Sequence, residues 1–217
     1  MPRSHAILPM KKTIVLVVLF VLPIVAYLFF ASGVNNFGKL PVLTEGISDL
    51  TAYKEGVSLK DKITVLGFLG YDLDGKKGNS FNLNEKIYKR FYEFKDFQLV
   101  MVLPEGEEQR VPEIRKELGK YSDMSKWKFV FMDERSIASF FSSLGTNIDL
   151  DENLSTPYVF IVDKEIRLRG RLDDEDEGTK YGYDTSSVAE LNNKMVDDTK
   201  IILAEYRMAL KKNSADR

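Results

Sequence analysis

Several runs of apolar residues, each bounded by polar or turn-forming residues, predict the strands of a buried sheet. Residues 63–69 (ITVLGFL) and 97–103 (FQLVMVL) are almost continuously apolar. Continuous rather than alternating hydrophobicity is typical of strands that are covered on both faces. Residues 128–132 and 158–162 are interpreted as two further strands, and residues 40–43 as a short first strand.

Apolar residues recur at helical spacing between these predicted strands. After a glycine-rich loop at residues 70–80, Asn82 is predicted to cap a helix. Helices are also predicted to begin near Pro112 and to cover residues 136–144, and a long helix capped by Ser187 follows the last strand. Strands that alternate with helices predict a mainly parallel sheet with helices on both faces.

One connection between predicted strands is too short for a helix. Residues 158–162 and 166–172 are separated by Asp163, Lys164 and Glu165 alone. A parallel crossover needs about a dozen residues or more, so these two strands are predicted to form an antiparallel hairpin. The expected fold class is therefore α/β, with a mixed sheet flanked by helices.

The longest apolar run, residues 13–31, precedes this domain. It is uncharged and close to the ~20 residues that cross the ~30 Å hydrocarbon core of a bilayer as a helix. Lys11 and Lys12 lie directly before it, and no basic residue follows until Lys39, so the positive-inside bias predicts a cytoplasmic N-terminus. Residues 13–32 are interpreted as a single transmembrane helix that anchors an extracytoplasmic domain at a bacterial inner membrane.

A cleaved signal peptide is the alternative to this anchor, because small residues stand at positions 31–33 (ASG). The apolar run is longer than the usual core of a signal peptide, which favours the uncleaved anchor. Both interpretations export the domain. The predicted organisation is a cytoplasmic segment at 1–12, the anchor at 13–32, a linker at 33–39, the exported domain at 40–212 and a tail at 213–217.

The sequence contains no cysteine. Disulfide formation, thiolate metal binding, thiol–disulfide exchange and thiol peroxidase chemistry are therefore excluded for this chain. Residues 34–217 carry 31 − 3 = 28 basic side chains, because Arg3, Lys11 and Lys12 precede them, and 33 acidic ones. With this net charge of −5, no nucleic-acid partner is expected, since phosphate binding needs clustered Lys and Arg.

The order of the predicted elements, with Thr156-Pro157 directly before the hairpin, resembles a thioredoxin fold. In that fold such a proline is usually cis and lies beside the active-site loop. More narrowly, the predicted anchor, residues 56–70 (GVSLKDKITVLGFLG) and residues 155–170 (STPYVFIVDKEIRLRG) resemble exported Sco/SenC-family proteins. Those proteins are copper chaperones of respiratory oxidase assembly.

The resemblance implies a copper site whose ligands this chain lacks. In the family, a CxxxC pair in the loop after the first core strand and a histidine before the hairpin bind copper. Here residues 70–80 and 151–156 contain neither, and His5 stands before the predicted anchor. The methionines are predicted to fill the core. No cofactor is therefore expected, and neither copper binding nor redox activity is transferred from the family.

The loop after the first central strand is where thioredoxin-like proteins present their chemistry, so it supplies the candidate partner-binding residues. They are Tyr71, Asp72 and Asp74 from the loop, and Thr156 and Pro157 from the segment before the hairpin. Two carboxylates in such a loop could hold a hard cation or position a basic group of a partner. Because Asp74 precedes a glycine, a purely structural role in a turn is the simpler interpretation.

An acidic run at residues 173–178 is the second candidate site. Asp173, Glu175, Glu177 and Asp184 recur at spacings that partly match a calcium-binding loop. The twelfth position of such a loop is normally a glutamate, and helices flank it. A solvated acidic loop is therefore the simpler interpretation.

Two functions from different classes follow from these features. The first is a non-catalytic binding or assembly factor at the cell envelope, with a protein partner and with a link to respiratory oxidase or copper-protein assembly implied by the resemblance. The alternative is a hard-cation-binding protein or a carboxylate-based enzyme that uses Asp72 and Asp74, or the loop at residues 173–184.

Overall fold

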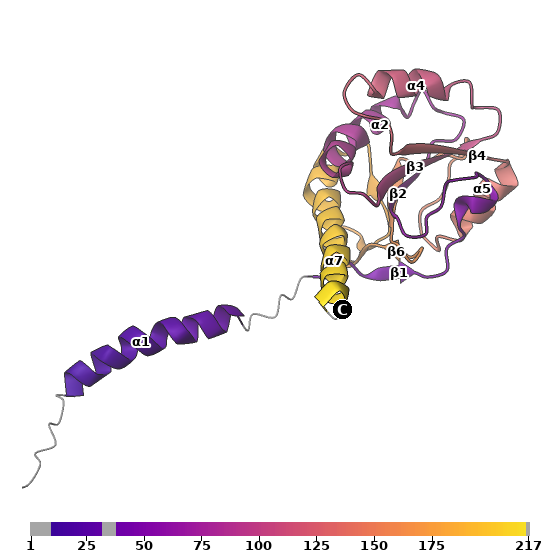
Figure 1. Cartoon of the computed structure of the whole chain (residues 1–217). Coiled ribbons are helices and arrows are strands. Elements are labelled where there is room, and N and C mark those ends of the chain that lie inside the picture. The colour runs from indigo at the N-terminus through magenta and orange to yellow at the C-terminus, as the bar shows by residue number, and fades with distance from the viewer. Residues whose placement is uncertain (1–9, 32–37, 216–217) are drawn as a thin grey trace, which may run out of the picture. The chain divides into compact units, whose positions relative to one another are not determined.

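The computed structural model describes residues 10–31 and 38–215 (Figure 1). The chain divides into two units, Met1–Phe37 and Gly38–Arg217. The first contains helix α1 (Met10–Ala31), with Pro23 inside it. Across the described ranges, no helix combines the length and the apolar character needed to cross a membrane. The predicted residues 1–9 of the cytoplasmic segment, with His5, and 32–37 of the anchor and linker lie outside the described part, as do residues 216–217.

A mixed sheet forms the centre of the second unit, with the strand order β1-β6-β5-β2-β3-β4 and with β9 paired to β5. A separate two-stranded ribbon joins β7 to β8. The strands are β1 (Val42–Thr44), β2 (Ile63–Phe68), β3 (Phe97–Pro104), β4 (Trp127–Met132), β5 (Tyr158–Val162), β6 (Leu168–Arg169), β7 (Arg171–Asp174), β8 (Gly178–Lys180) and β9 (Tyr183–Asp184).

The strand directions agree with the mixed sheet expected from the connection lengths. Strands β2, β3 and β4 are parallel, with Ile63 opposite Phe97 and Leu99 opposite Trp127. Strand β5 is antiparallel to β2 and to β6. The predicted hairpin is confirmed, although its second strand is shorter than expected, because β7 leaves the sheet and pairs with β8.

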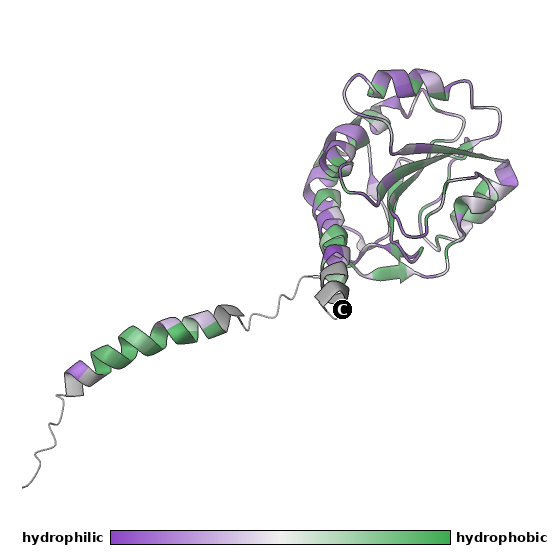
Figure 2. Ribbon diagram, viewed as in Figure 1, coloured by the Kyte–Doolittle hydropathy of each residue, from purple (hydrophilic) through white to green (hydrophobic). Residues whose placement is uncertain are grey.

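Helices cover both faces of the sheet (Figure 1). The helical elements of the second unit are η1 (Leu50–Ala52), α2 (Lys77–Leu83), η2 (Asn84–Tyr88), α3 (Lys89–Phe91), α4 (Val111–Leu118), α5 (Glu134–Ser142), α6 (Val188–Glu190), η3 (Leu191–Met195) and α7 (Val196–Ala215). One core cluster packs α2 to α4 and α7 against one face, and the other packs η1 and α5 against the opposite face. Figure 2 shows the resulting apolar strands inside a more hydrophilic surface.

Alternate residues of the central strands supply the two cores. Val65 and Leu99 belong to the first cluster, whereas Leu66 and Val100 belong to the second. Strand side chains point alternately to the two faces, so a continuously apolar strand is needed to fill both. The mixed sheet with helices on both faces fits an α/β thioredoxin-like fold.

The predicted start of the first covering helix is wrong. Helix α2 begins at Lys77, and Asn82 lies inside it, where its side chain donates a hydrogen bond to the carbonyl of Thr185 at 3.0 Å. The helix starts early because the preceding turn already bonds in helical fashion. The backbone N–H of Lys76 donates to the carbonyl of Asp72 at 3.1 Å, and Ser80 N–H donates to Lys76 at 3.0 Å. The Ser187 cap is confirmed, since its side chain accepts from Glu190 N–H.

A buried carboxylate organises the hairpin between β5 and β6. Asp163 is 0% exposed and accepts hydrogen bonds from the guanidinium groups of Arg167 at 2.9 Å and Arg169 at 2.8 Å. Its other oxygen accepts from the backbone N–H groups of Glu165 and Arg167. Arg169 also donates to the carbonyl of Leu40 and to Glu205. Buried charges are tolerated only when paired in this way.

This network predicts a specific dependence of stability on pH. Burial acts to raise the pKa of Asp163, but the hydrogen bonds from Arg167 and Arg169 outweigh it and lower the pKa below the usual 3.8. The contribution of Asp163 is therefore present above that value and is lost as the pH falls through the folded-state pKa. In urea unfolding of wild type and Asp163→Asn, we expect the free-energy difference to shrink below about pH 4. A constant difference down to low pH would contradict this assignment.

Candidate functional site

The loop after β2 lies directly beside the segment that precedes β5. The backbone N–H of Tyr71 donates to the carbonyl of Asn153 at 2.9 Å, and the N–H of Thr156 donates to the carbonyl of Phe68 at 3.2 Å. The expectation that residues 70–80 would lie close to Pro157 is thus confirmed. These two segments form the candidate surface, defined here as residues 70–76 together with residues 151–157.

Gly70 makes the close approach of the two segments possible. Its φ is +57°, in the left-handed region, and a Cβ atom there would lie 2.0 Å from the carbonyl oxygen of Asn153. Only glycine adopts this conformation without a steric penalty and leaves room for that oxygen. The loop position that the resemblance assigned to chemistry is therefore a point of tight backbone contact in this chain.

Substituting Gly70 tests the importance of that contact. Gly70→Ala is expected to destabilise the fold clearly more than Gly46→Ala, whose φ is +72° but whose Cβ position is open. The control carries only the conformational cost, about 1 kcal/mol, whereas Gly70→Ala must also displace the backbone at Asn153. Urea unfolding measures both, and equal losses would show that the contact contributes nothing.

The two candidate carboxylates of the loop have structural roles. Asp72 accepts a hydrogen bond from the N–H of Gly75 at 3.1 Å, which closes a turn. Asp74 pairs with Lys77 at 3.0 Å and with Arg110 at 2.7 Å. The hydrogen bond from Lys77, and then that from Arg110, lowers the pKa of Asp74. Turn formation and ion pairing account for both residues.

Tyr71 is the aromatic residue of the candidate surface. Tyr71 is 38% exposed, and its hydroxyl donates to Glu134 of α5 at 2.9 Å. Its carbonyl accepts from Arg110 at 3.0 Å. The hydrogen bond to Glu134 raises the pKa of Tyr71 above its usual 10.0, because the bond favours the protonated phenol that donates it. Tyr71 is therefore held in place at both ends while part of its ring remains open to solvent.

Thr156 and Pro157 lie against the start of the last helical region. Thr156 is buried, and the carbonyl of Pro157 accepts from the N–H of Thr185 at 2.9 Å. All peptide bonds in the described ranges are trans, so the cis proline implied by the resemblance is not found. Next to them, Asp151 accepts from the N–H groups of Asn153 and Ser155 and fixes the turn.

The space beneath this surface is too small for a substrate. A hollow of about 10 Å³ lies between β2, α2 and Thr156, and Ser80 lines it with a buried hydroxyl that lacks a partner in the described ranges. That volume is on the order of one water molecule. A larger, open hollow of about 750 Å³ borders the surface at Asp151 and Leu154, but its other walls belong to α5 and to residues 145–150. The loop of residues 70–76 therefore presents polar groups and one aromatic ring to the outside without enclosing a cavity.

The acidic residues of the second candidate site do not converge. Glu177 pairs with Lys180 at 2.5 Å, and Asp184 accepts from the N–H of Ser186 at 2.8 Å, while Asp173 and Glu175 are exposed. Over the described ranges, no three acidic or histidine side chains are grouped to hold a metal ion. The calcium-loop interpretation has no geometric support, because strands β7 and β8 flank the turn where helices would be needed.

Two residues that contact the candidate surface were not predicted from the sequence. Arg110 joins the loop to the start of α4, because it contacts both Tyr71 and Asp74, and Glu134 joins the loop to α5. They stand 39 and 63 positions from Tyr71 in the chain. No local pattern marks such contacts, since only the parallel order of β2, β3 and β4 brings the ends of these strands together.

Comparisons with known proteins give remote similarities only. No family model matches the sequence, and no curated protein matches it. Similar solved structures include BsSco, a member of the Sco family of cytochrome c oxidase assembly proteins, with 12% identity, a TM-score of 0.49, and coverage of 76% of this chain and 97% of that one.

A second Sco-type protein and a thiol-disulfide oxidoreductase are also among the similar solved structures. A SCO1/SenC family lipoprotein from Bacillus anthracis str. Ames has 16% identity, a TM-score of 0.45, and coverage of 77% of this chain and 98% of that one. The thioredoxin domain of a thiol-disulfide oxidoreductase from Bacteroides vulgatus has 17% identity, a TM-score of 0.38, and coverage of 74% and 95%. At these values, nothing about the activity of this chain follows from the similarity.

Proposed function

We propose that this chain is a membrane-anchored protein whose thioredoxin-like domain works outside the cytoplasm as a non-catalytic binding or assembly factor. The observation that supports this most is the candidate surface itself. The chain has no cysteine, the carboxylates of the surface are engaged in turns and ion pairs, and the hollow beneath holds about one water. A loop at residues 70–76 without a cavity beneath it, beside an open hollow at Asp151 and Leu154, suits contact with a macromolecule better than enclosure of a small substrate.

The anchor and its direction are proposed from the sequence. Residues 13–31 are uncharged and apolar over about the length of a bilayer core, and Lys11 and Lys12 precede them. From the same charges we infer that the domain lies on the extracytoplasmic side of a bacterial inner membrane. We expect the chain to stay with membranes after extraction with alkaline carbonate.

The absence of native cysteine allows a direct test of this orientation. In spheroplasts, a membrane-impermeant maleimide is expected to label Lys200→Cys, whose side chain is 60% exposed, but to label Ser4→Cys only after detergent is added. If both variants were labelled without detergent, the proposal that residues 13–32 anchor the chain across the membrane would be wrong. If Ser4→Cys were labelled without detergent and Lys200→Cys only with it, the N-terminus would lie outside the cytoplasm and the domain inside it.

Site-specific crosslinking tests the binding function. A photoreactive phenylalanine analogue at Tyr71 is expected to give a discrete adduct with one protein in intact cells. Tyr121, which is 58% exposed and outside the candidate surface, is the matched control position. If Tyr71 gives no adduct, or gives the same adducts as Tyr121, the candidate surface is not the binding site.

The narrower hypothesis concerns the identity of the partner. The sequence resemblance to Sco/SenC proteins suggests a protein of respiratory oxidase or copper-protein assembly, held by this domain without binding the metal. Identification of the Tyr71 adduct decides this point. A partner from another process would leave the binding function intact and remove the link to oxidase assembly.

A further inference from the structure

A hollow at the other end of β2 differs in character from the candidate surface. It has a volume of about 230 Å³, and its walls are Ile63 at the start of β2, Phe94, and Leu203 and Tyr206 of α7. Phe94 is 42% exposed, which is unusual for a phenylalanine. The volume is below the ~300–1,000 Å³ of pockets that enclose whole small molecules, so it fits part of an apolar chain.

The rim of this hollow is positively charged. Lys95, Lys164 and Arg207 line it with Asp96 as the one acid, a local balance of 3 − 1 = +2 within a domain of net charge −5. Lys164 forms an ion pair with Asp96. Lys95 and Arg207 form no ion pair with any residue in the described ranges. Two cations are therefore available beside an apolar wall.

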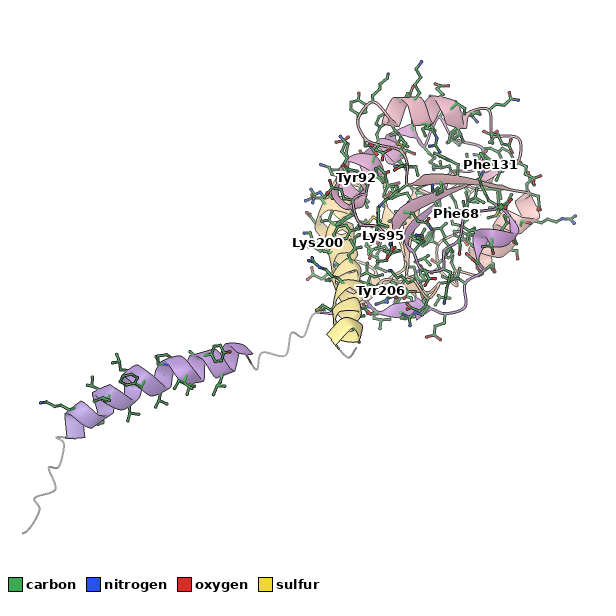
Figure 3. All side chains as sticks on the ribbon, in the orientation of Figure 1. Phe68, Tyr92, Lys95, Phe131, Lys200 and Tyr206 are labelled. Carbon is green, nitrogen blue, oxygen red and sulfur yellow. The ribbon has the colours of Figure 1, made fainter. Side chains whose placement is uncertain are left out.

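The walls around these cations are held in a defined position. The hydroxyl of Tyr206 bonds to Glu165, and the ammonium group of Lys164 lies 5.6 Å from the centre of the Tyr206 ring. Figure 3 labels Lys95 and Tyr206 of this hollow, together with Lys200 on the same helix α7. These two contacts fix the ring of Tyr206 in the wall of the hollow.

We propose that this hollow binds an anionic lipid of the membrane, with part of an acyl chain against Phe94, Leu203 and Tyr206 and with the head phosphate between Lys95 and Arg207. This inference rests on the proposed membrane location of the domain. A zwitterionic lipid would supply the chain without net charge, and a free phosphate would supply the charge without the chain. An anionic lipid supplies both.

Lipid binding to the full chain in neutral detergent can be measured by native mass spectrometry. Phosphatidylglycerol is expected to bind more tightly than phosphatidylcholine. In the double variant Lys95→Gln/Arg207→Gln, binding of phosphatidylglycerol is expected to weaken about fivefold for each cation removed. Lys200→Gln removes an exposed cation of α7 outside the hollow and should change nothing.

Two further variants separate the parts of the site and the rival sources of the preference. Phe94→Gln should weaken both lipids, and sn-glycerol 3-phosphate, which lacks an acyl chain, should compete poorly. Lys11→Gln/Lys12→Gln tests whether the preference for phosphatidylglycerol belongs to the residues before the apolar run. The proposal is overturned if that variant abolishes the preference or if Lys95→Gln/Arg207→Gln retains it.

Failure of the lipid site and failure of the anchor give different results. If the chain remains monodisperse without detergent, the proposed anchor is wrong. The two lipids can then still be compared in buffer, so the lipid site is tested independently. If the chain needs detergent but binds the two lipids equally, the proposed lipid site is wrong and the proposed anchor stands. Lys95, Arg207 and Phe94 are exposed, so the variants at these positions are expected to keep the fold, and circular dichroism of each variant checks it.

Discussion

Replacing Asp163 by alanine is expected to lower the free energy of unfolding by about 3–5 kcal/mol, the range found when one member of a buried ion pair is removed. The side chain of Arg169 is 2% exposed and would lose its fully buried acidic partner, keeping only the more exposed Glu205. The backbone N–H groups of Glu165 and Arg167 would also lose the carboxylate oxygen that they bond. Chemical denaturation of the purified chain measures the change.

An exposed acid provides the matched control for this experiment. Asp197 pairs with Lys200 at 2.9 Å, but both side chains are largely exposed. Asp197→Ala is expected to cost at most about 1 kcal/mol, because water screens such pairs. Comparable losses for Asp163→Ala and Asp197→Ala would mean that the buried network does not stabilise the hairpin.

Replacing Phe68 by alanine is the second change with a large expected effect, about 3–5 kcal/mol. Phe68, which is labelled in Figure 3, ends β2 and is 1% exposed. It packs edge-on against Phe141 with ring centres 5.0 Å apart and against Phe160 at 6.3 Å. Removal of its ring would leave a cavity in the core cluster that contains Phe141 and Phe160. The backbone carbonyl of Phe68 accepts from Thr156, so this part of the core lies next to the candidate surface.

The control for this cavity is a phenylalanine that is not buried in the core. Phe94 is 42% exposed, so Phe94→Ala is expected to cost less than about 1 kcal/mol. Thermal or urea unfolding of both variants gives the comparison. A small effect of Phe68→Ala would mean that the end of β2 is not a packed part of the core.

The sheet could be predicted from the sequence because its strands fill two cores. Residues 63–69 and 97–103 are apolar except for Thr64 and Gln98, and the observed strands begin at the same residues. The hairpin could be predicted because a connection of three residues permits one direction only. These features depend on local sequence, so local reasoning finds them.

Features that depend on distant contacts could not be predicted in this way. The start of α2 depends on the turn that Asp72 closes, and the pattern around Asn82 gave a false cap. Arg169 and Lys180 are charged residues that sequence patterns assign to the surface, yet both are buried against acidic partners. Their burial follows from tertiary pairing alone.

The candidate surface was predicted in part. Tyr71, Asp72 and Asp74 were selected from the position of their loop, and the structure brings that loop beside Thr156 and Pro157. The roles of the two carboxylates follow from Gly75, Lys77 and Arg110, and the parallel strand order decides which of these residues meet. The position of a loop in the fold is therefore enough to locate the candidate surface, but it does not predict which contacts its side chains make.

Quantitative capture from solubilised membranes tests the central claim most directly, by comparing wild type with Tyr71→Ala and with the control Tyr121→Ala. If residues 70–76 and 151–157 form the binding surface, one or a few proteins should be depleted at least tenfold with Tyr71→Ala and retained with Tyr121→Ala. Equal recovery of every captured protein with all three chains would contradict it.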